Sequence, residues 1–308
     1  MAVHTPLSTH QIEDLLKNYQ LGQFRSVKPI HGGVTNSNFF LETDQGEYVL
    51  TLFEALSAGE LQFYIDVLVH LESYLPVACP IKDRVGERIQ RIYNKPVVIA
   101  EKLAGEHIDQ PCDAECRKIG ETLAVLHKTT QHLSVYHPNP RSFSWQQKTL
   151  EELLPHLSLA EKRVAEKAFQ AALTVPHELL PATIIHGDLF RDNVLFENET
   201  LTGILDFYYC CTDAMIYDIA VTAVDWCFDE NNQWVESRFQ GMLVGYEYIR
   251  KLHPVERDSF HSLLAQACSR FWLARRWAEL YVTDETVLKK PSAEMYARLN
   301  FALSRIRD

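Results

Sequence analysis

The hydrophobic pattern of the chain changes near residues 102–105, and this change constrains the fold more than any other feature. Before it, short apolar runs rich in β-branched residues alternate with turn residues, as in the hairpin predicted from 39–43 and 48–53. After it, apolar residues recur mainly at the three- and four-residue spacing of helices. We therefore expect an α+β protein with two lobes, a small sheet-rich lobe over residues 1–103 and a larger, mainly helical lobe over 104–308.

The pattern also predicts the main elements of each lobe. In the small lobe, helices are expected at 8–22 and 57–74, and a second hairpin is expected to join strands at 87–93 and 96–103. In the large lobe, the apolar segment 183–186 has the length and composition of a short strand. That strand is important because chemically active residue types follow it directly.

Charge and cysteine usage exclude several classes of function. The 308 residues include 30 Lys+Arg and 41 Asp+Glu, a net charge of -11, which disfavours binding to a phosphate backbone. No apolar run approaches the ~18 residues of a membrane span, so no membrane partner is expected. The seven cysteines follow no signal-like N-terminus, which favours reduced thiols and a cytoplasmic location. The sequence predicts no particular oligomeric state.

Three oxygen-bearing side chains follow the strand at 183–186 in a pattern that suits phosphoryl transfer. Asp188 and Asn193 are five positions apart, and Asp206 ends the strand predicted at 201–207. Alone, each would more often be a turn or cap residue. Together they supply a carboxylate to orient and deprotonate an acceptor hydroxyl and two oxygen ligands for Mg²⁺, which keeps several waters. We predict that Asp188 has the first role, and that Asn193 and Asp206 hold the metal.

At these positions the sequence resembles the aminoglycoside phosphotransferase and choline-kinase branch of the protein-kinase-like superfamily. The loop beginning at His186 reads HxDxxxxN, and Ile204-Leu205-Asp206-Phe207 is similar to the metal-binding segment of that branch. Gly187 stands where protein kinases carry Arg. The resemblance implies a two-lobed kinase fold, with ATP and Mg²⁺ as cofactors. It also implies that His186 and Asp218 support the catalytic loop.

The resemblance extends to the small lobe, where it implies the contacts to ATP. Residues 31–38 are similar to the phosphate-covering loop of the family, and 100–103 align with the hinge that meets adenine. Thr51 stands where many of these kinases have a Lys that grips the phosphates, so phosphate binding is expected to depend more on Mg²⁺ and backbone donors. The implied ATP-binding residues are Gly32, Gly33, Thr35, Asn36, Ser37, Thr51, Glu101 and Leu103.

Within the superfamily the chain most resembles the homoserine kinases of this fold. The segments that carry this resemblance are 48–54, 211–214 and 225–227. It implies ATP-dependent phosphorylation of L-homoserine to O-phospho-L-homoserine in threonine biosynthesis. The substrate ammonium would then require a carboxylate, and its carboxylate an arginine. The candidates are Asp213 and Asp225 for the ammonium, Arg270, Arg275 and Arg276 for the carboxylate, and Tyr208 for the pocket wall.

Two alternatives to this function stay open. The acceptor could be another small hydroxyl compound: an aminoglycoside, choline, ethanolamine or methylthioribose. The chain could also be a pseudokinase that only binds, an idea that Thr51 supports and that the intact set of Asp188, Asn193 and Asp206 opposes. A zinc site is not expected, because His127 and His132 lie five positions apart on one predicted helix and point in different directions.

Overall fold

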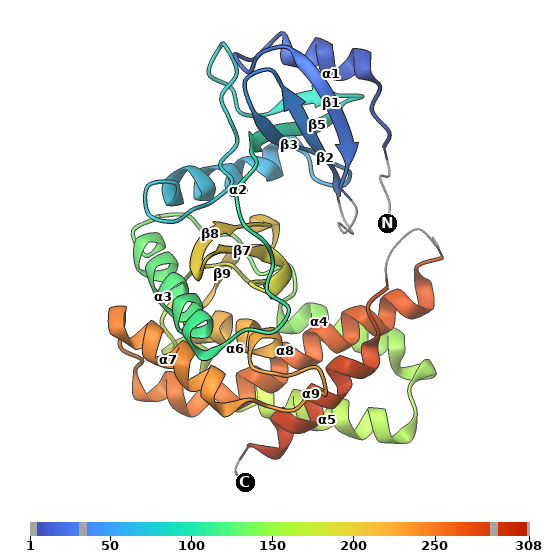
Figure 1. Cartoon of the computed structure of the whole chain (residues 1–308). Helices are drawn as coiled ribbons and strands as arrows, with labels where there is room; N and C mark the ends of the chain where they lie inside the picture. Colours follow the sequence, from blue (N-terminus) through green and yellow to red (C-terminus); the bar gives the residue numbers. More distant parts are fainter. Residues whose placement is uncertain (1–4, 31–35, 284–288, 307–308) are drawn as a thin grey trace. The chain divides into compact units, whose positions relative to one another are not determined.

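The computed structural model describes residues 5–30, 36–283 and 289–306. These residues divide into two compact units, an N-terminal unit that ends at Ala104 and a C-terminal unit that begins at Gly105 (Figure 1). The first is built around a sheet and the second mainly from helices, which confirms the expected α+β, two-lobed architecture. Among the described helices, none combines the length and apolar character needed to cross a membrane.

The N-terminal unit contains a five-stranded antiparallel sheet in the order β1-β2-β3-β5-β4. Its strands are β1 (Phe24–Pro29), β2 (Asn36–Thr43), β3 (Glu47–Phe53), β4 (Gln90–Ile92) and β5 (Lys95–Glu101). Both predicted hairpins form. The second hairpin has a two-residue turn at Tyr93 and Asn94. Both residues have positive φ, which lets the turn match the right-handed twist of the flanking strands. β4 is shorter than the predicted strand because the Asp83 carboxylate accepts the backbone N–H groups of Val85 and Glu87 and holds that segment in a turn.

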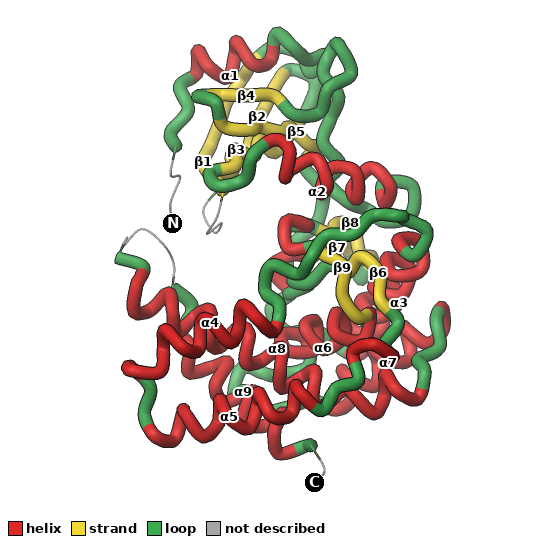
Figure 2. The backbone as a smooth tube through the Cα atoms, turned by 180° about the vertical axis from the view of Figure 1, so that it is seen from behind, coloured by secondary structure: helices red, strands yellow, loops and turns green. Residues whose placement is uncertain are grey.

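Two helices accompany this sheet, α1 (Thr9–Leu16) and α2 (Ala58–Leu71) (Figure 2). The Ser8–Gln11 and Ser57–Glu60 pairs form capping boxes that start them. α1 ends earlier than predicted because Tyr19 leaves the helical path to enter the hydrophobic core. That core joins α1 to one face of the sheet, and its members include Ile12, Leu15, Leu16, Leu41, Leu50, Leu52, Val97 and Ile99.

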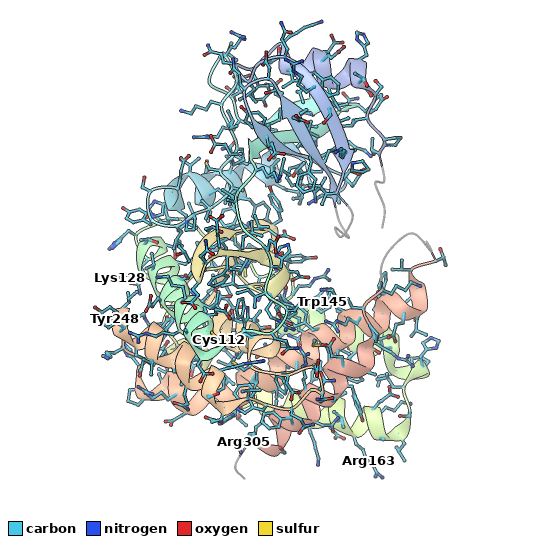
Figure 3. All side chains as sticks on the ribbon, in the orientation of Figure 1. Cys112, Lys128, Trp145, Arg163, Tyr248 and Arg305 are labelled. Carbon is cyan, nitrogen blue, oxygen red and sulfur yellow. The ribbon has the colours of Figure 1, made fainter. Side chains whose placement is uncertain are left out.

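Seven α-helices are described in the C-terminal unit. They are α3 (Asp113–Thr130), α4 (Phe143–Leu153), α5 (Leu159–Leu173), α6 (Met215–Trp226), α7 (Glu236–Ile249), α8 (Pro254–Tyr281) and α9 (Ser292–Ser304). Their side chains fill the space among the helices, whereas Lys128 and Tyr248 project outward (Figure 3). α3 and α7 pack backbone to backbone. A Cβ on Gly120 would lie 1.9 Å from the Met242 carbonyl oxygen, and one on Gly245 would lie 2.0 Å from that of Arg117.

Two small antiparallel ribbons in this unit place the loops that matter for function. β6 (Ala182–Ile185) pairs with β9 (Cys211–Ala214), and β7 (Val194–Glu197) pairs with β8 (Thr200–Ile204). The chain therefore passes from β6 to β7 through residues 186–193, and from β8 to β9 through residues 205–210. Since each loop joins one ribbon to the other, both are held at each end by paired strands.

Candidate active site

The loop from β6 to β7 presents Asp188 on a backbone held by several hydrogen bonds. The Asp188 carbonyl oxygen accepts from the Phe190 N–H and from the Asn193 side-chain amide, both at 2.8 Å. The half-buried Asp188 carboxylate makes no hydrogen bond or ion pair within the part of the chain that the structure describes. A carboxylate held in place but without a partner is suited to receive a proton from a ligand.

Asp218 on α6 holds the start of this loop. Its Oδ2 accepts the His186 backbone N–H at 2.8 Å and the His127 ring at 3.0 Å, and its Oδ1 accepts the Gly187 N–H at 2.8 Å. Burial opposes ionisation, but these donors prevail and hold the pKa of Asp218 below its usual value. The fully buried carboxylate therefore stays charged and holds the backbone of the two residues before Asp188.

His186 joins the two functional loops. Its Nδ1 accepts the Asp188 backbone N–H at 3.2 Å, and its Nε2 donates to the Leu205 carbonyl oxygen at 3.0 Å, one residue before Asp206. This pair of contacts requires the neutral ring with the proton on Nε2. Burial lowers the pKa of His186, against the opposing effects of Asp218 and the Leu205 carbonyl, and so favours that neutral form.

The neutral His186 gives a pH dependence of stability. The unfolded imidazole takes up a proton near its ordinary pKa of about 6.5, whereas the folded ring resists, so the unfolded state binds more protons. Stability from this group is therefore complete above that pKa and declines as the pH falls through it. Between about pH 7 and pH 5, we expect the unfolding free energy to fall less steeply with falling pH in His186→Gln than in the wild type. The two slopes should differ by up to ~1.4 kcal/mol per pH unit. Urea titrations read by tryptophan fluorescence measure both slopes, and parallel curves would contradict the assignment.

Asn193 and Asp206 are brought together by the second ribbon. Val194 pairs with Ile204, and the Leu205 N–H donates to the Asn193 carbonyl oxygen at 2.8 Å, so the residues on either side of this bond lie on adjacent backbones. The Asn193 amide nitrogen is used by the Asp188 carbonyl, which leaves its oxygen as an acceptor. Asp206 is exposed and has a left-handed backbone with φ of 56°.

The oxygen atoms of Asn193 and Asp206 fit a divalent cation. One amide oxygen and one exposed carboxylate match the hard oxygen ligands of Mg²⁺, which completes its shell with water and phosphate oxygens. Within the described ranges, no group of three or more His, Cys, Asp or Glu side chains could hold a metal by itself. The residues therefore fit an ion that arrives with a phosphate ligand, and they do not form an all-protein cage.

The carboxylates of the site are electrostatically coupled. Burial raises the pKa of Asp188 to about 7, the positive charge of Arg270 opposes the rise, and the negative charge of Asp206 adds to it. Loss of hydration likewise raises the pKa of Asp206 to about 6 even though its side chain reaches solvent, and the Tyr208 backbone N–H opposes this. Two neighbouring carboxylates with raised pKa values indicate a site whose ionised form a bound cation would stabilise.

Asp225, which was predicted to bind substrate, lies on α6 and contacts the loop from β6 to β7. Its Oδ2 accepts the Arg191 side-chain Nε–H at 2.9 Å and the Arg191 backbone N–H at 2.8 Å, and its Oδ1 accepts from the Arg191 Nη2 at 3.0 Å. On the same helix, the Trp226 indole donates to the Leu189 carbonyl oxygen. Because the Asp225 carboxylate is already ion-paired with Arg191, it holds this loop, and its contact with a substrate ammonium stays a prediction.

The other two predicted substrate residues lie on the segment that follows Asp206. Tyr208 belongs to a short 3₁₀ turn and is half-buried. Asp213 lies on β9 opposite Thr183 of β6, and its carboxylate accepts the Asn139 amide at 2.6 Å and the Ala214 N–H at 2.7 Å. Burial raises the pKa of Asp213 despite these donors. No cation among the described residues forms an ion pair with it.

The three candidate arginines of α8 differ in their partners. Arg275 is paired with Glu294, and Arg276 is paired with Glu279 at 3.1 Å. Arg270 is 4 % exposed, and its Nη1 donates to the Gly187 carbonyl oxygen at 2.6 Å. It forms no ion pair with any carboxylate of the described chain. Only Arg270 among the three therefore keeps its charge available beside the catalytic loop.

The predicted ATP-binding residues of the N-terminal unit are only partly described. Gly32, Gly33 and Thr35 lie outside the described residues. Asn36 begins β2, and the buried Ser37 hydroxyl donates to Glu54 at 2.6 Å, so that hydroxyl is engaged within the unit. The Glu54 carboxylate also receives the Lys95 ammonium and the Thr5 hydroxyl.

The remaining predicted ATP-binding residues of this unit are Thr51, Glu101 and Leu103. Thr51 is buried on β3 between Asn38 and Val98. Glu60 accepts the Ser57 N–H at 2.8 Å and so caps the N-terminus of α2. Glu101 and Leu103 border a cavity of about 390 Å³, together with residues 77–82. The Leu103 N–H donates to no described residue, so it is open to a ligand acceptor.

Several supporting residues could not be identified from the sequence. His127 bonds both Asp218 and the Tyr246 hydroxyl, and Arg191 holds Asp225. Only its place on an otherwise apolar helical face marked His127 in the sequence as a residue with a specific role. Its partners are 91 and 119 residues away, and no local pattern points to them.

Comparison with known proteins places these features in context. The model of the phosphotransferase enzyme family matches residues 26–252. A protein named homoserine kinase from Polaromonas naphthalenivorans (strain CJ2) is 36% identical over 297 residues, 94% of each chain. One of the same name from Methylobacillus flagellatus is 37% identical over 276 residues, 89% of this chain and 86% of the relative.

Solved structures share the fold at low sequence identity. The amicoumacin kinase hAmiN, solved with AMP-PNP, Ca²⁺ and Ami, has a TM-score of 0.74 and 15% identity over 97% of this chain and 93% of that one. The spectinomycin phosphotransferase APH(9)-Ia, solved with ADP and its antibiotic, has a TM-score of 0.72 and 11% identity over 97% and 98%. These similarities support the two-lobed fold, while the identities above 35% relate most of the chain to the homoserine kinases.

Proposed function

Because this chain belongs to the phosphotransferase enzyme family, we propose that it transfers the terminal phosphoryl group of ATP to the side-chain hydroxyl of L-homoserine. The products are ADP and O-phospho-L-homoserine, which places the enzyme in threonine biosynthesis. The observation that supports homoserine as the acceptor is the 36–37% identity to homoserine kinases over most of the chain. The observation that carries the chemistry is the unpartnered Asp188 carboxylate on a loop held by Asp218 and His186.

Asp188 has the properties of the general base in this reaction. A pKa of about 7, raised by burial, lies near neutral pH, so the carboxylate can hold the acceptor hydroxyl and take its proton as the oxygen–phosphorus bond forms. The bond from phosphorus to the bridging oxygen of ADP breaks in the same displacement. The proton then passes from Asp188 to water, which restores the carboxylate.

Asn193 and Asp206 would hold the divalent cation, which we propose to be Mg²⁺. When bound, this ion neutralises charge on the phosphates of ATP. Asp206 must be ionised to ligate it, and the positive charge would favour that ionised form. His186 fixes the distance between this ligand and Asp188, because one ring contacts both loops.

The nucleotide contacts form a further part of the proposal. We assign phosphate contacts to Asn36 and to Gly32, Gly33 and Thr35, and adenine contacts to the backbone near Glu101 and Leu103. The free Leu103 N–H supports the second assignment. Thr51 supplies no positive charge, so the triphosphate would depend on the metal and on backbone donors. A cytoplasmic location is also part of the proposal, and it is supported by the seven cysteines, all of which are free thiols.

A coupled assay of ADP release over a panel of acceptors tests the function. The panel contains L-homoserine, choline, ethanolamine, an aminoglycoside and methylthioribose, each with Mg²⁺ and with Mg²⁺ removed by EDTA. We expect the highest kcat/KM with homoserine, and loss of turnover in EDTA that excess Mg²⁺ restores. Preferred turnover of another acceptor would refute the substrate, and absence of both turnover and nucleotide binding would identify a pseudokinase.

A further inference from the structure

Arg270 is a buried cation without an anionic partner. The guanidinium has five N–H donors, and the Gly187 carbonyl oxygen receives a bond from Nη1. The cation also lies 5.8 Å from the centre of the Tyr209 ring and 4.6 Å from that of Phe271. Burying a charge is costly unless a partner compensates it. Other arginines of this unit have carboxylate partners, as Arg191, Arg275 and Arg276 do.

Asp213 is a half-buried anion that likewise lacks an ion-pair partner among the described residues. Each oxygen accepts one neutral donor, from Asn139 or from the backbone of Ala214, and each keeps a second lone pair. Asn139 is itself fixed, because its oxygen accepts the Arg141 N–H at 2.7 Å. The Asp213 carboxylate is therefore held in one orientation with acceptor capacity to spare.

The two charges influence each other without touching. Arg270 lowers the pKa of Asp213 electrostatically, yet the pair forms no ion pair within 4.0 Å. Both are tied to the reacting loop: Arg270 bonds the residue before Asp188, and Asp213 lies on the strand paired with β6, which leads into that loop. Opposite charges that are fixed but separate provide the two receptors that a zwitterion needs.

We propose that Arg270 binds the carboxylate and Asp213 the ammonium group of an α-amino-acid acceptor, and that this pair makes the enzyme selective for amino acids over other alcohols. The inference rests on the proposed function and deepens it. A guanidinium can hold a carboxylate through two parallel hydrogen bonds, and an ammonium group satisfies the spare acceptors of a carboxylate. An alcohol that lacks either group leaves the buried Arg270 or the half-buried Asp213 without a partner for its charge, which penalises binding.

Two analogues of homoserine separate these contacts. 3-Aminopropan-1-ol lacks the carboxylate, and 4-hydroxybutanoate lacks the ammonium group. For the wild type we expect kcat/KM with homoserine to exceed that with either analogue by ~10²-fold or more. In Arg270→Met the preference for homoserine over 3-aminopropan-1-ol should fall by about 10²-fold, and in Asp213→Asn the preference over 4-hydroxybutanoate should fall similarly. Ratios are the readout because a general loss of activity cancels in them.

Matched variants keep the test decisive. Arg276→Met removes an arginine six residues along α8 that is paired with Glu279, and Asp258→Asn alters an exposed carboxylate, so both should preserve the wild-type ratios. If Arg270→Met does not fold, Arg270→Lys replaces it, because lysine keeps the positive charge. This variant should lower the preference for homoserine over 3-aminopropan-1-ol by about 10-fold, since lysine cannot form the two parallel hydrogen bonds. If the Arg270 and Asp213 variants slow all three compounds equally, the residues are structural and this proposal is overturned. If the wild type does not phosphorylate homoserine, it is the proposed function that fails.

Discussion

Replacing Asp188 with asparagine is expected to lower kcat with homoserine by about 10²- to 10⁴-fold, the range that a positioned general base contributes. An amide of the same shape can still touch the acceptor hydroxyl but cannot take its proton. The loop should be unaffected, because its hydrogen bonds use the backbone of Asp188 and not the carboxylate. The KM for ATP and the unfolding transition should therefore remain close to those of the wild type, and the coupled ADP assay measures the loss.

Asp192 provides a matched control on the same loop. Its exposed carboxylate pairs with Lys290 at 2.7 Å, and Asp192→Asn conserves shape in the same way as the first substitution. Only a few-fold change in kcat is expected, because that side chain has no role in proton transfer. If Asp188→Asn retains activity comparable to Asp192→Asn, another group serves as the base.

Asp218→Ala is expected to destabilise the C-terminal unit by about 3–5 kcal/mol, the usual cost of removing one partner from a buried charged network. The substitution leaves the backbone N–H groups of His186 and Gly187 and the ring of His127 without their acceptor. All five tryptophans lie beyond Gly105, so tryptophan fluorescence during urea unfolding reports this unit alone.

The control for this experiment is Asp258→Ala on the exposed side of α8, which should change the unfolding free energy by no more than ~0.5 kcal/mol. A loss of less than about 1 kcal/mol in Asp218→Ala would mean that the loop holds itself in place and that the buried carboxylate is dispensable.

The elements that were predictable from sequence are those set by local patterns. The hairpin predicted from 39–43 and 48–53 depends on residues within a few positions, and it forms as expected. The helix predicted at 8–22 ends at Leu16 instead, because burial of Tyr19 in the sheet core outweighs the local preference. Tertiary packing decides where such an element stops.

The candidate site divides in the same way. Asp188, Asn193 and Asp206 could be identified from the sequence because they are close along the chain and one short ribbon lies between them. The Leu205–Asn193 hydrogen bond brings their two segments together. The substrate residues were harder to identify because an acidic residue near the site can bind a ligand or an internal cation. Asp225 pairs with Arg191 across 34 residues of sequence, and only the folded chain shows that pairing.

Phosphorus NMR of the reaction of ATP, Mg²⁺ and L-homoserine tests the central claim most directly, because it identifies the atom that receives the phosphoryl group. A carboxylate that activates a bound hydroxyl predicts one phosphate monoester on the side-chain oxygen of homoserine for each ADP formed, with little inorganic phosphate. Inorganic phosphate appearing in step with ADP would show that water is the acceptor, and would contradict the role of Asp188 as the base that activates homoserine.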